Sequence, residues 1–150
     1  MSTLPSQSRP AEILLVDDSS IDFKLTCKAF ERERLIVNLH HVDNGEECLA
    51  FLRKQGKYSG VPTPDLILLD INMPVMDGHE VLAQMVQDEN LKHLPVVILT
   101  SSEDERDVLM MYKLRCNAYL TKPVDALKFQ EVIKLVNAFW LTVVVLPPNH

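Results

Sequence analysis

The sequence of 150 residues contains no long apolar segment, no excess of positive charge and no closely spaced pair of cysteines. No stretch approaches the roughly 20 apolar residues that a membrane-spanning helix needs. The polar start, MSTLPSQSRP, lacks the apolar core of a signal peptide. Lysine and arginine number 15 against 21 aspartates and glutamates, which argues against general binding to a nucleic acid backbone. We therefore expect a cytoplasmic protein that binds neither membranes nor nucleic acids.

Cysteine and histidine are too dispersed to suggest a metal knuckle or a redox pair. Cys27, Cys48 and Cys116 lie far apart and are interpreted as ordinary thiols of a reducing compartment. The histidines show no metal-ligand spacing and are interpreted as structural or surface residues: His40, His41, His79, His93 and His150.

The order of apolar segments predicts a doubly wound α/β domain. With 47% hydrophobic and 24% charged residues, the composition suits one compact domain. Short apolar runs are expected to form five strands: 12–16, 36–42, 65–69, 95–99 and 117–120. Helical patterns follow them at 20–34, 45–55, 79–89, 103–115 and 126–140. Because three of the strands are almost continuously apolar, we expect a five-stranded parallel sheet covered on both faces.

The remaining segments are assigned by their composition. Residues 1–11 are expected to form a flexible N-terminal tail, residues 12–140 the α/β domain and residues 141–150 a C-terminal extension that could belong to a dimer interface. Residues 55–64 are rich in glycine and proline and are expected to form a surface loop.

Polar side chains follow four of the predicted strands at the point where each strand ends. They are Asp17 and Asp18 after the first strand, Asp70 after the third, Thr100 after the fourth and Lys122 after the fifth. Since the carboxyl ends of parallel strands form one edge of a doubly wound sheet, we expect these side chains to lie together. Asp70 ends the buried run LILLD, where a carboxylate is unfavourable unless a partner compensates its desolvation.

Each of these residues also has an ordinary interpretation when it is taken alone. Asp18 or Ser19 would cap the first helix, and Asp77 is expected to cap the third. Thr100 or Ser101 would cap the fourth helix, and Lys122 would be a loop lysine. Their joint occurrence favours a site, because three convergent carboxylates repel one another and a hard cation such as Mg²⁺ relieves that repulsion. A lysine and a hydroxyl beside them suit phosphoryl transfer.

Four motifs in this order resemble the receiver domain of two-component response regulators. They are DD at 17–18, LLDINMPVMDG at 68–78, LTSS at 99–102 and YLTKP at 119–123. The resemblance covers residues 11–140 and implies a flavodoxin-like, CheY-like fold with strand order 2-1-3-4-5. It also implies a signalling protein that accepts a phosphoryl group and loses it slowly, rather than an enzyme with a separate substrate.

The resemblance implies a role for each residue of the metal and phosphorylation site. Asp70 would take a phosphoryl group from a sensor histidine kinase. Asp18, Asp70 and the backbone carbonyl of Asn72 would bind Mg²⁺, and Asp17 would assist through water. Lys122 would pair first with Asp70 and then with the phosphoryl oxygens.

The resemblance also implies a conformational switch. Thr100 would move to hydrogen-bond the phosphoryl group, and Tyr119 would turn inward behind it. The peptide bond from Lys122 to Pro123 resembles the family's cis bond, which proline permits.

Further segments resemble the small stand-alone regulators associated with bacterial phytochrome kinases. These segments are QGKYSGVPTPDLILLD at 55–70, LKHLPVVILTSS at 91–102 and FWLTVVVLPP at 139–148. The resemblance implies a phytochrome-type kinase as partner and a homodimer.

Other functions remain to be weighed against a phosphorylated receiver. A flavin-binding module is disfavoured because the acids of DDSSID at 17–22 would repel the flavin phosphate. A fast aspartyl phosphohydrolase is disfavoured because Asn72 stands where such enzymes place a general acid, and an amide cannot deliver a proton. A phosphorelay intermediate and an unphosphorylated protein-binding adaptor stay open.

The C-terminal residues carry two apolar stripes at helical spacing. One comprises Phe129, Ile133, Val136 and Trp140, and the other Val132, Leu135 and Phe139. One stripe would cover the sheet, whereas the second would leave a large apolar patch on a monomer. We expect a homodimer formed by the fourth helix, the fifth strand and the last helix. Alternatively, the last helix has a wide apolar face and the tail folds back over its own domain.

Overall fold

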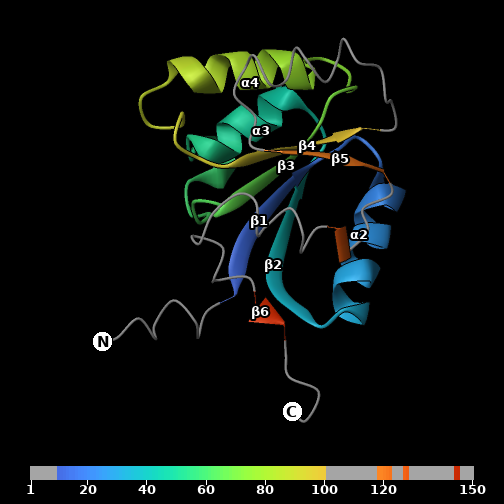
Figure 1. Ribbon diagram of the computed structural model, residues 1–150. Helices are drawn as coiled ribbons and strands as arrows, with labels where there is room; N and C mark the ends of the chain where they lie inside the picture. Colours follow the sequence, from blue (N-terminus) through green and yellow to red (C-terminus); the bar gives the residue numbers. More distant parts are fainter. Residues whose placement is uncertain (1–9, 101–117, 123–126, 129–143, 146–150) are drawn as a thin grey trace.

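The computed structural model describes residues 10–100, 118–122, 127–128 and 144–145 (Figure 1). Among these residues, no helix is long and apolar enough to cross a membrane. The described residues form a central sheet with helices on both faces. The predicted helices at 103–115 and 126–140 lie outside them, except for Leu127 and Lys128, which are helical.

Five parallel strands make up the body of the sheet. They are β1 (Ala11–Val16), β2 (Leu35–Val42), β3 (Leu66–Asp70), β4 (Val96–Thr100) and β5 (Ala118–Thr121). Their order is β5-β4-β3-β1-β2, and every neighbouring pair is parallel. The predicted fold class and strand order are therefore confirmed, with strand boundaries that differ from the predicted ones by one residue.

A sixth strand, which the sequence did not predict, lies at the edge of the sheet. This strand, β6 (Val144–Val145), pairs antiparallel with the start of β2, with Ile36 opposite Val144 and Leu35 opposite Val145. The β-branched residues of TVVVL suit an extended strand. Two residues of the extension that was expected to contribute to a dimer interface are thus paired with the sheet of the same chain.

Within residues 10–100, three helices and one short 3₁₀ turn connect the parallel strands. They are α2 (Ser20–Arg32), α3 (Gly45–Leu52), η1 (Gly56–Tyr58) and α4 (Gly78–Gln87). Each helix begins within one residue of its predicted start and ends two or three residues before its predicted end. The side chains of Ser19, Asn44 and Asp77 cap the three helices by accepting a hydrogen bond from a backbone N–H of the first turn. The predicted cap at Asp77 is confirmed, and Ser19 rather than Asp18 caps α2.

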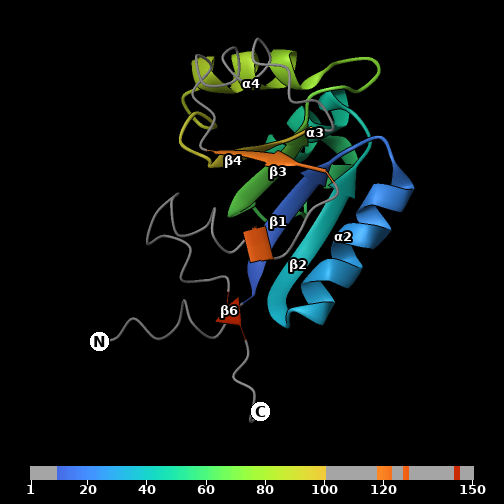
Figure 2. The same ribbon diagram turned by 45° about the vertical axis from the view of Figure 1, so that its right-hand side comes forward.

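Side chains of the central strands point alternately to the two faces of the sheet and belong to two separate cores. On one face of the sheet, α3 and α4 cover a core that includes Leu14, Val16, Ile67 and Leu69. On the other face, Phe30 of α2 packs in a core that includes Ile13, Leu15, Leu66 and Leu68. Figure 2 shows this arrangement, with α2 on one side of the sheet and α3 and α4 on the other. All five residues of β3 are buried, which explains its nearly continuous apolar sequence. Asp70 is the last residue of this buried strand and therefore lies at the carboxyl edge of the sheet.

Candidate phosphorylation and metal site

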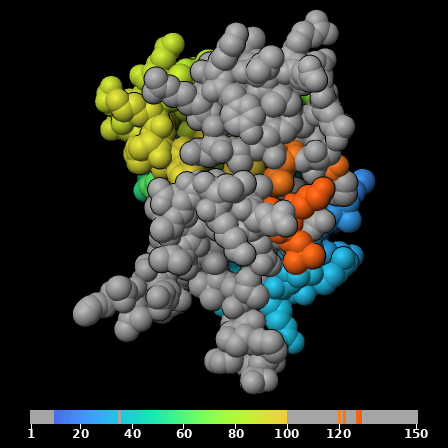
Figure 3. All heavy atoms as spheres, in the orientation of Figure 1, coloured from blue at the N-terminus to red at the C-terminus, as the bar shows by residue number. Residues whose placement is uncertain are grey.

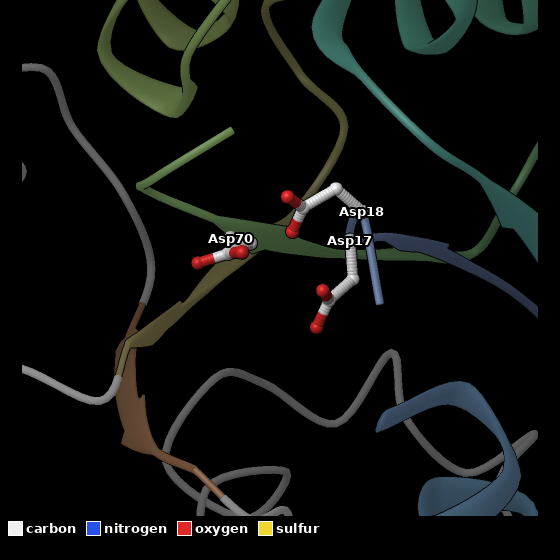
Figure 4. A group of neighbouring side chains, drawn as sticks. All are labelled: Asp17, Asp18 and Asp70. Atoms are coloured by element: carbon white, nitrogen blue, oxygen red, sulfur yellow. The ribbon is translucent and has the colours of Figure 1, made fainter. Parts of the chain in front are cut away.

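Three carboxylates meet at the carboxyl ends of two neighbouring strands. Asp17 and Asp18 follow β1, and Asp70 is the last residue of β3, which pairs with β1. One carboxylate oxygen from each residue lies within 4.8 Å of those of the other two (Figure 4). Asp17 and Asp70 are buried, whereas Asp18 is exposed. The structure therefore brings together the three acids that the sequence placed at one edge.

Asp17 is the most confined of the three acids. Its Oδ1 accepts a hydrogen bond of 2.9 Å from the backbone N–H of Ser19. Its Oδ2 is buried and has no hydrogen bond of good geometry within the described residues, although the Lys122 Nζ lies 2.9 Å away. Burial raises the pKa of Asp17 from 3.8 to about 6, against the opposing effects of Lys122 and the Ser19 N–H. A buried carboxylate with one incompletely satisfied oxygen is suited to receive a cation.

Asp70 is held between a backbone donor and a cation. Its Oδ1 accepts a hydrogen bond of 3.3 Å from the Asn72 N–H, and its Oδ2 accepts one of 3.0 Å from the Lys122 ammonium. Burial raises the pKa of Asp70, although Lys122 and the Asn72 N–H oppose the shift. Lys122 thus provides the partner that the buried acid at the end of LILLD requires.

Lys122 contacts more carboxylates than the sequence suggested. Besides Asp17 and Asp70, its Nζ lies 3.1 Å from Oδ2 of Asp22, in the first turn of α2. Burial by itself would lower the pKa of Lys122, but the carboxylates of Asp17 and Asp70 outweigh it and raise the pKa above its ordinary value. Asp22 was not among the predicted site residues. The signal that could have found it is a third acid in DDSSID, four residues after Asp18, where a helical turn returns toward the strand end.

A histidine supports the backbone of Asp17 from the neighbouring strand. The Nε2 of His41 lies 2.7 Å from the Asp17 carbonyl oxygen, and the Asp17 N–H donates a hydrogen bond of 3.1 Å to the Val42 carbonyl. The ring of Phe23 stacks on His41, with centroids 4.7 Å apart and planes 8° apart. These contacts fix the start of the β1–α2 loop against β2. They could not be predicted from the sequence, because they join residues on separate elements.

The donor set fits a hard divalent cation. Carboxylate oxygens are ligands that Mg²⁺ and Mn²⁺ accept, and these ions retain water molecules that an exposed residue such as Asp18 leaves room for. The incompletely satisfied Oδ2 of Asp17 adds a reason for positive charge at this position. Asn72 follows Asp70 by two residues, and the bond from its N–H to Asp70 keeps its backbone at the same edge.

The loop that follows Asp70 is tightly held at its far end. Gly78 donates its N–H to the Ile71 carbonyl at 2.9 Å, and a β-carbon at position 78 would lie 2.5 Å from the Asp70 carbonyl oxygen. Gly45 donates its N–H to the Met76 carbonyl at 3.1 Å, and a β-carbon there would lie 2.6 Å from the same oxygen. Val75, at the outside of the loop, has a φ of 69°, which is unfavourable for a β-branched residue.

The switch residues are only partly within the described structure. Thr100 ends β4 and pairs with Thr121 of β5, and Tyr119 pairs with Ile98. The backbone of Thr100 thus lies on β4, beside β3, and that of Tyr119 on β5, the next strand outward. The side chains of both residues lie outside the described part of the structure, as does Pro123. The Thr100 and Tyr119 switch and the cis peptide at Lys122 and Pro123 stay predictions.

Comparisons with known proteins agree with this geometry. The family model of the response regulator receiver domain matches residues 13–134. The chain is 41% identical over 138 residues to the response regulator Rcp1 of Synechocystis sp.. This alignment covers 92% of this chain and 94% of Rcp1. The crystal structure of the Mn²⁺-bound form of Rcp1 has a TM-score of 0.72 and covers 92% of this chain and 99% of its own.

Two further solved structures come from regulators named for phytochromes. The bacteriophytochrome response regulator AtBRR is 36% identical, has a TM-score of 0.79 and covers 88% of this chain and 96% of its own. The phosphorylated cyanobacterial phytochrome response regulator RcpA is 37% identical, has a TM-score of 0.73 and covers 92% and 99%. The predicted similarity to phytochrome-associated regulators is confirmed, and the chain belongs to the response regulator receiver family.

Proposed function

We propose that this protein is a response regulator that accepts a phosphoryl group on Asp70 from a sensor histidine kinase of the phytochrome type. The observation that carries the proposal is the hydrogen bond of 3.0 Å between Lys122 and Asp70 beside the cluster of Asp17 and Asp18. Phosphoryl transfer needs a nucleophile, a cation for the transferred oxygens and a metal site, and the edge of the sheet supplies residues for all three.

In the proposed reaction, a carboxylate oxygen of Asp70 attacks the phosphorus of a phosphohistidine. The new bond is an acyl phosphate bond from Asp70 to phosphorus, and the bond from phosphorus to the donor imidazole breaks. The imidazole leaves with its electron pair and takes up a proton. Lys122 neutralises oxygens of the transferred group. Mg²⁺, held by Asp17, Asp18, Asp70 and the Asn72 carbonyl, would supply further charge neutralisation when bound.

The phosphoryl group would be removed from Asp70 by slow hydrolysis. Asn72, two residues after Asp70, cannot act as a general acid or base because an amide does not titrate. Water would therefore attack the acyl phosphate without a strong proton acceptor from this position. The protein would catalyse its own phosphorylation and dephosphorylation once per cycle and would act as a signal carrier.

The partners follow from the relatives and from the sequence. AtBRR and RcpA are named for phytochromes, which supports a phytochrome-type kinase as donor. A homodimer through residues 103–115, β5 and residues 126–140 rests on the apolar stripes of the C-terminal sequence. Phosphorylation would alter this surface through Thr100 and Tyr119. The free thiols of Cys27 and Cys48 favour the cytoplasm as the place of action.

The first experiment measures the intact mass of the protein after incubation with acetyl phosphate and Mg²⁺. The wild type should gain one phosphoryl group, and peptide mapping should place it on Asp70. Asp70→Asn should remain unlabelled, whereas Asp77→Asn, an equivalent change at the cap of α4, should be labelled like the wild type. Labelling of Asp70→Asn at the wild-type level would disprove the assignment.

The partners need two separate measurements. Purified phytochrome-type kinase that has been autophosphorylated should transfer its label to the wild type and not to Asp70→Asn, and absence of transfer would contradict the partner assignment. Sedimentation equilibrium should show a dimer for the wild type and a weaker one for a chain ending at Asn137. A wild type that stays monomeric at tens of micromolar, with or without phosphorylation, would contradict the homodimer.

A further inference from the structure

The Lys122 ammonium is surrounded by three carboxylate oxygens at nearly equal distances. Its Nζ lies 2.9 Å from Asp17 Oδ2, 3.0 Å from Asp70 Oδ2 and 3.1 Å from Asp22 Oδ2. The ammonium donates a hydrogen bond to Asp70 Oδ2, and its contacts with Asp17 and Asp22 are ion pairs. Its side chain is 16% exposed, which limits replacement of these partners by water. In the space-filling view, described residues of 118–128 (orange) border α2 (blue) at the surface (Figure 3).

The three partners of Lys122 differ in what else they do. Asp17 and Asp70 belong to the carboxylate cluster that fits a divalent cation, and Asp70 is the proposed phosphoryl acceptor. Both would change their bonding when a cation binds or when Asp70 is phosphorylated. Asp22 lies outside that cluster and has no part in the proposed reaction. It is therefore the partner whose charge and position stay available to Lys122 throughout the cycle.

The position of Asp22 is fixed by local structure. Its N–H donates a hydrogen bond of 3.1 Å to the Ser19 hydroxyl, which caps α2. Its carbonyl accepts a hydrogen bond of 2.8 Å from the hydroxyl of Thr26 one turn later. A carboxylate on a capped helical turn has fewer backbone conformations than one on a free loop. Contact with Asp22 thus connects the flexible lysine side chain to a fixed point on α2.

We propose that Asp22 is a positioning residue that holds the Lys122 ammonium beside Asp70 while Asp17 and Asp70 engage the cation and the phosphoryl group. This inference rests on the proposed phosphorylation of Asp70. Without Asp22, Lys122 loses the one partner outside the reaction that the described residues provide, and its ammonium samples more positions. A charge that is not held in place stabilises the phosphoryl oxygens less in the transition state.

Asp43 provides a matched control for the change in charge. It lies just beyond the carboxyl end of β2, its side chain is 76% exposed, and its recorded ion contact is with His41 at 3.7 Å rather than with Lys122. Asp22→Asn and Asp43→Asn each remove one negative charge from this end of the sheet. A general effect of charge on an anionic phosphodonor therefore appears in both variants, whereas an effect through Lys122 appears only in the first.

The test measures the rate constant of phosphorylation by acetyl phosphate at saturating Mg²⁺. Relative to Asp43→Asn, Asp22→Asn should react about 3- to 5-fold more slowly, the range expected from loss of a partly exposed ion pair. In a Lys122→Gln background, Asp22→Asn and Asp43→Asn should react at equal rates, because only the general effect of charge remains. With Lys122 present, equal rates for Asp22→Asn and Asp43→Asn would overturn the inference, as would the same loss with and without Lys122. A wild type that is not labelled at all would instead overturn the proposed function.

A second measurement uses the metal-free protein and does not depend on phosphorylation. In EDTA, the shift in melting temperature caused by Asp22→Asn should be less favourable in the wild type than in the Lys122→Gln background. The two shifts should differ by about 1 to 3 °C, because only the wild type loses an ion pair. Identical shifts in the two backgrounds would show that Asp22 and Lys122 do not interact and would overturn the inference.

Discussion

Replacing Asp17 by asparagine should stabilise the metal-free protein at neutral pH. Burial raises the pKa of this carboxyl from 3.8 to about 6, so its ionised form is less favourable in the folded protein than in the unfolded chain. Asparagine has nearly the same shape and carries no charge. The substitution therefore removes an unfavourable charge from a residue that is 0% exposed to solvent.

The pKa shift sets the size and the pH range of the effect. A shift of about 2 pH units corresponds to about 3 kcal/mol, because each unit is worth about 1.4 kcal/mol. Since the folded-state pKa is the higher one, the contribution of Asp17 to stability is fully present below about pH 4 and is lost as the pH rises through 6. The advantage of Asp17→Asn should grow over this range and stay constant above pH 7, with an upper limit of about 6 to 12 °C in melting temperature.

The assay is thermal unfolding followed by circular dichroism in EDTA, between pH 4 and pH 8. The difference between Asp17→Asn and wild type reports the titration of Asp17 together with that of Asp70, which interacts with it electrostatically, because the acids outside this cluster titrate alike in both proteins. Asp43→Asn, which changes an exposed acid, should show no comparable rise with pH. The reasoning would be refuted if Asp17→Asn had no higher melting temperature than the wild type at pH 8. It would also be refuted if the difference in melting temperature did not change between pH 4 and pH 7.

Three other predictions concern the same end of the sheet. Millimolar Mg²⁺ should raise the melting temperature of the wild type but not of Asp18→Ala, since binding to the folded state stabilises it; equal responses would contradict the metal site. Val75→Gly should raise the unfolding free energy in urea by about 1 kcal/mol, because glycine accepts a φ of 69° that is strained for valine; a loss of stability would show that no strain is relieved. Gly78→Ala should lower that free energy by about 2 kcal/mol or more, because its β-carbon would lie 2.5 Å from the Asp70 carbonyl oxygen; an unchanged urea midpoint would argue against the close approach.

The sheet and the main site were predictable because both follow from short, strongly patterned segments. β3 is apolar at four consecutive positions and ends on Asp70, so burial on both faces and an acid at the edge could be inferred together. The parallel topology then placed Asp17, Asp18 and Lys122 beside it without any knowledge of side-chain geometry.

The features that were missed depend on how elements pack. The contact of Asp22 with Lys122 requires the first turn of α2 to lie beside the end of β5, and no sequence periodicity encodes that distance. The stacking of Phe23 on His41 joins α2 to β2 in the same way. β6 has only two residues, and its partner on β2 precedes it by more than a hundred positions, so its pairing depends on the path of the chain between them.

The two glycines that hold the loop after Asp70 also determine how this part of the sequence can vary. Positions 45 and 78 have no room for a side chain, since a β-carbon at either would meet backbone atoms of the loop or of Asp70. Val75, by contrast, is 71% exposed and is not among the atoms nearest to either position. Sequence drift can therefore alter the outer surface of the loop while the nucleophile keeps its place. Related regulators can in this way acquire different binding preferences without any change in their shared chemistry.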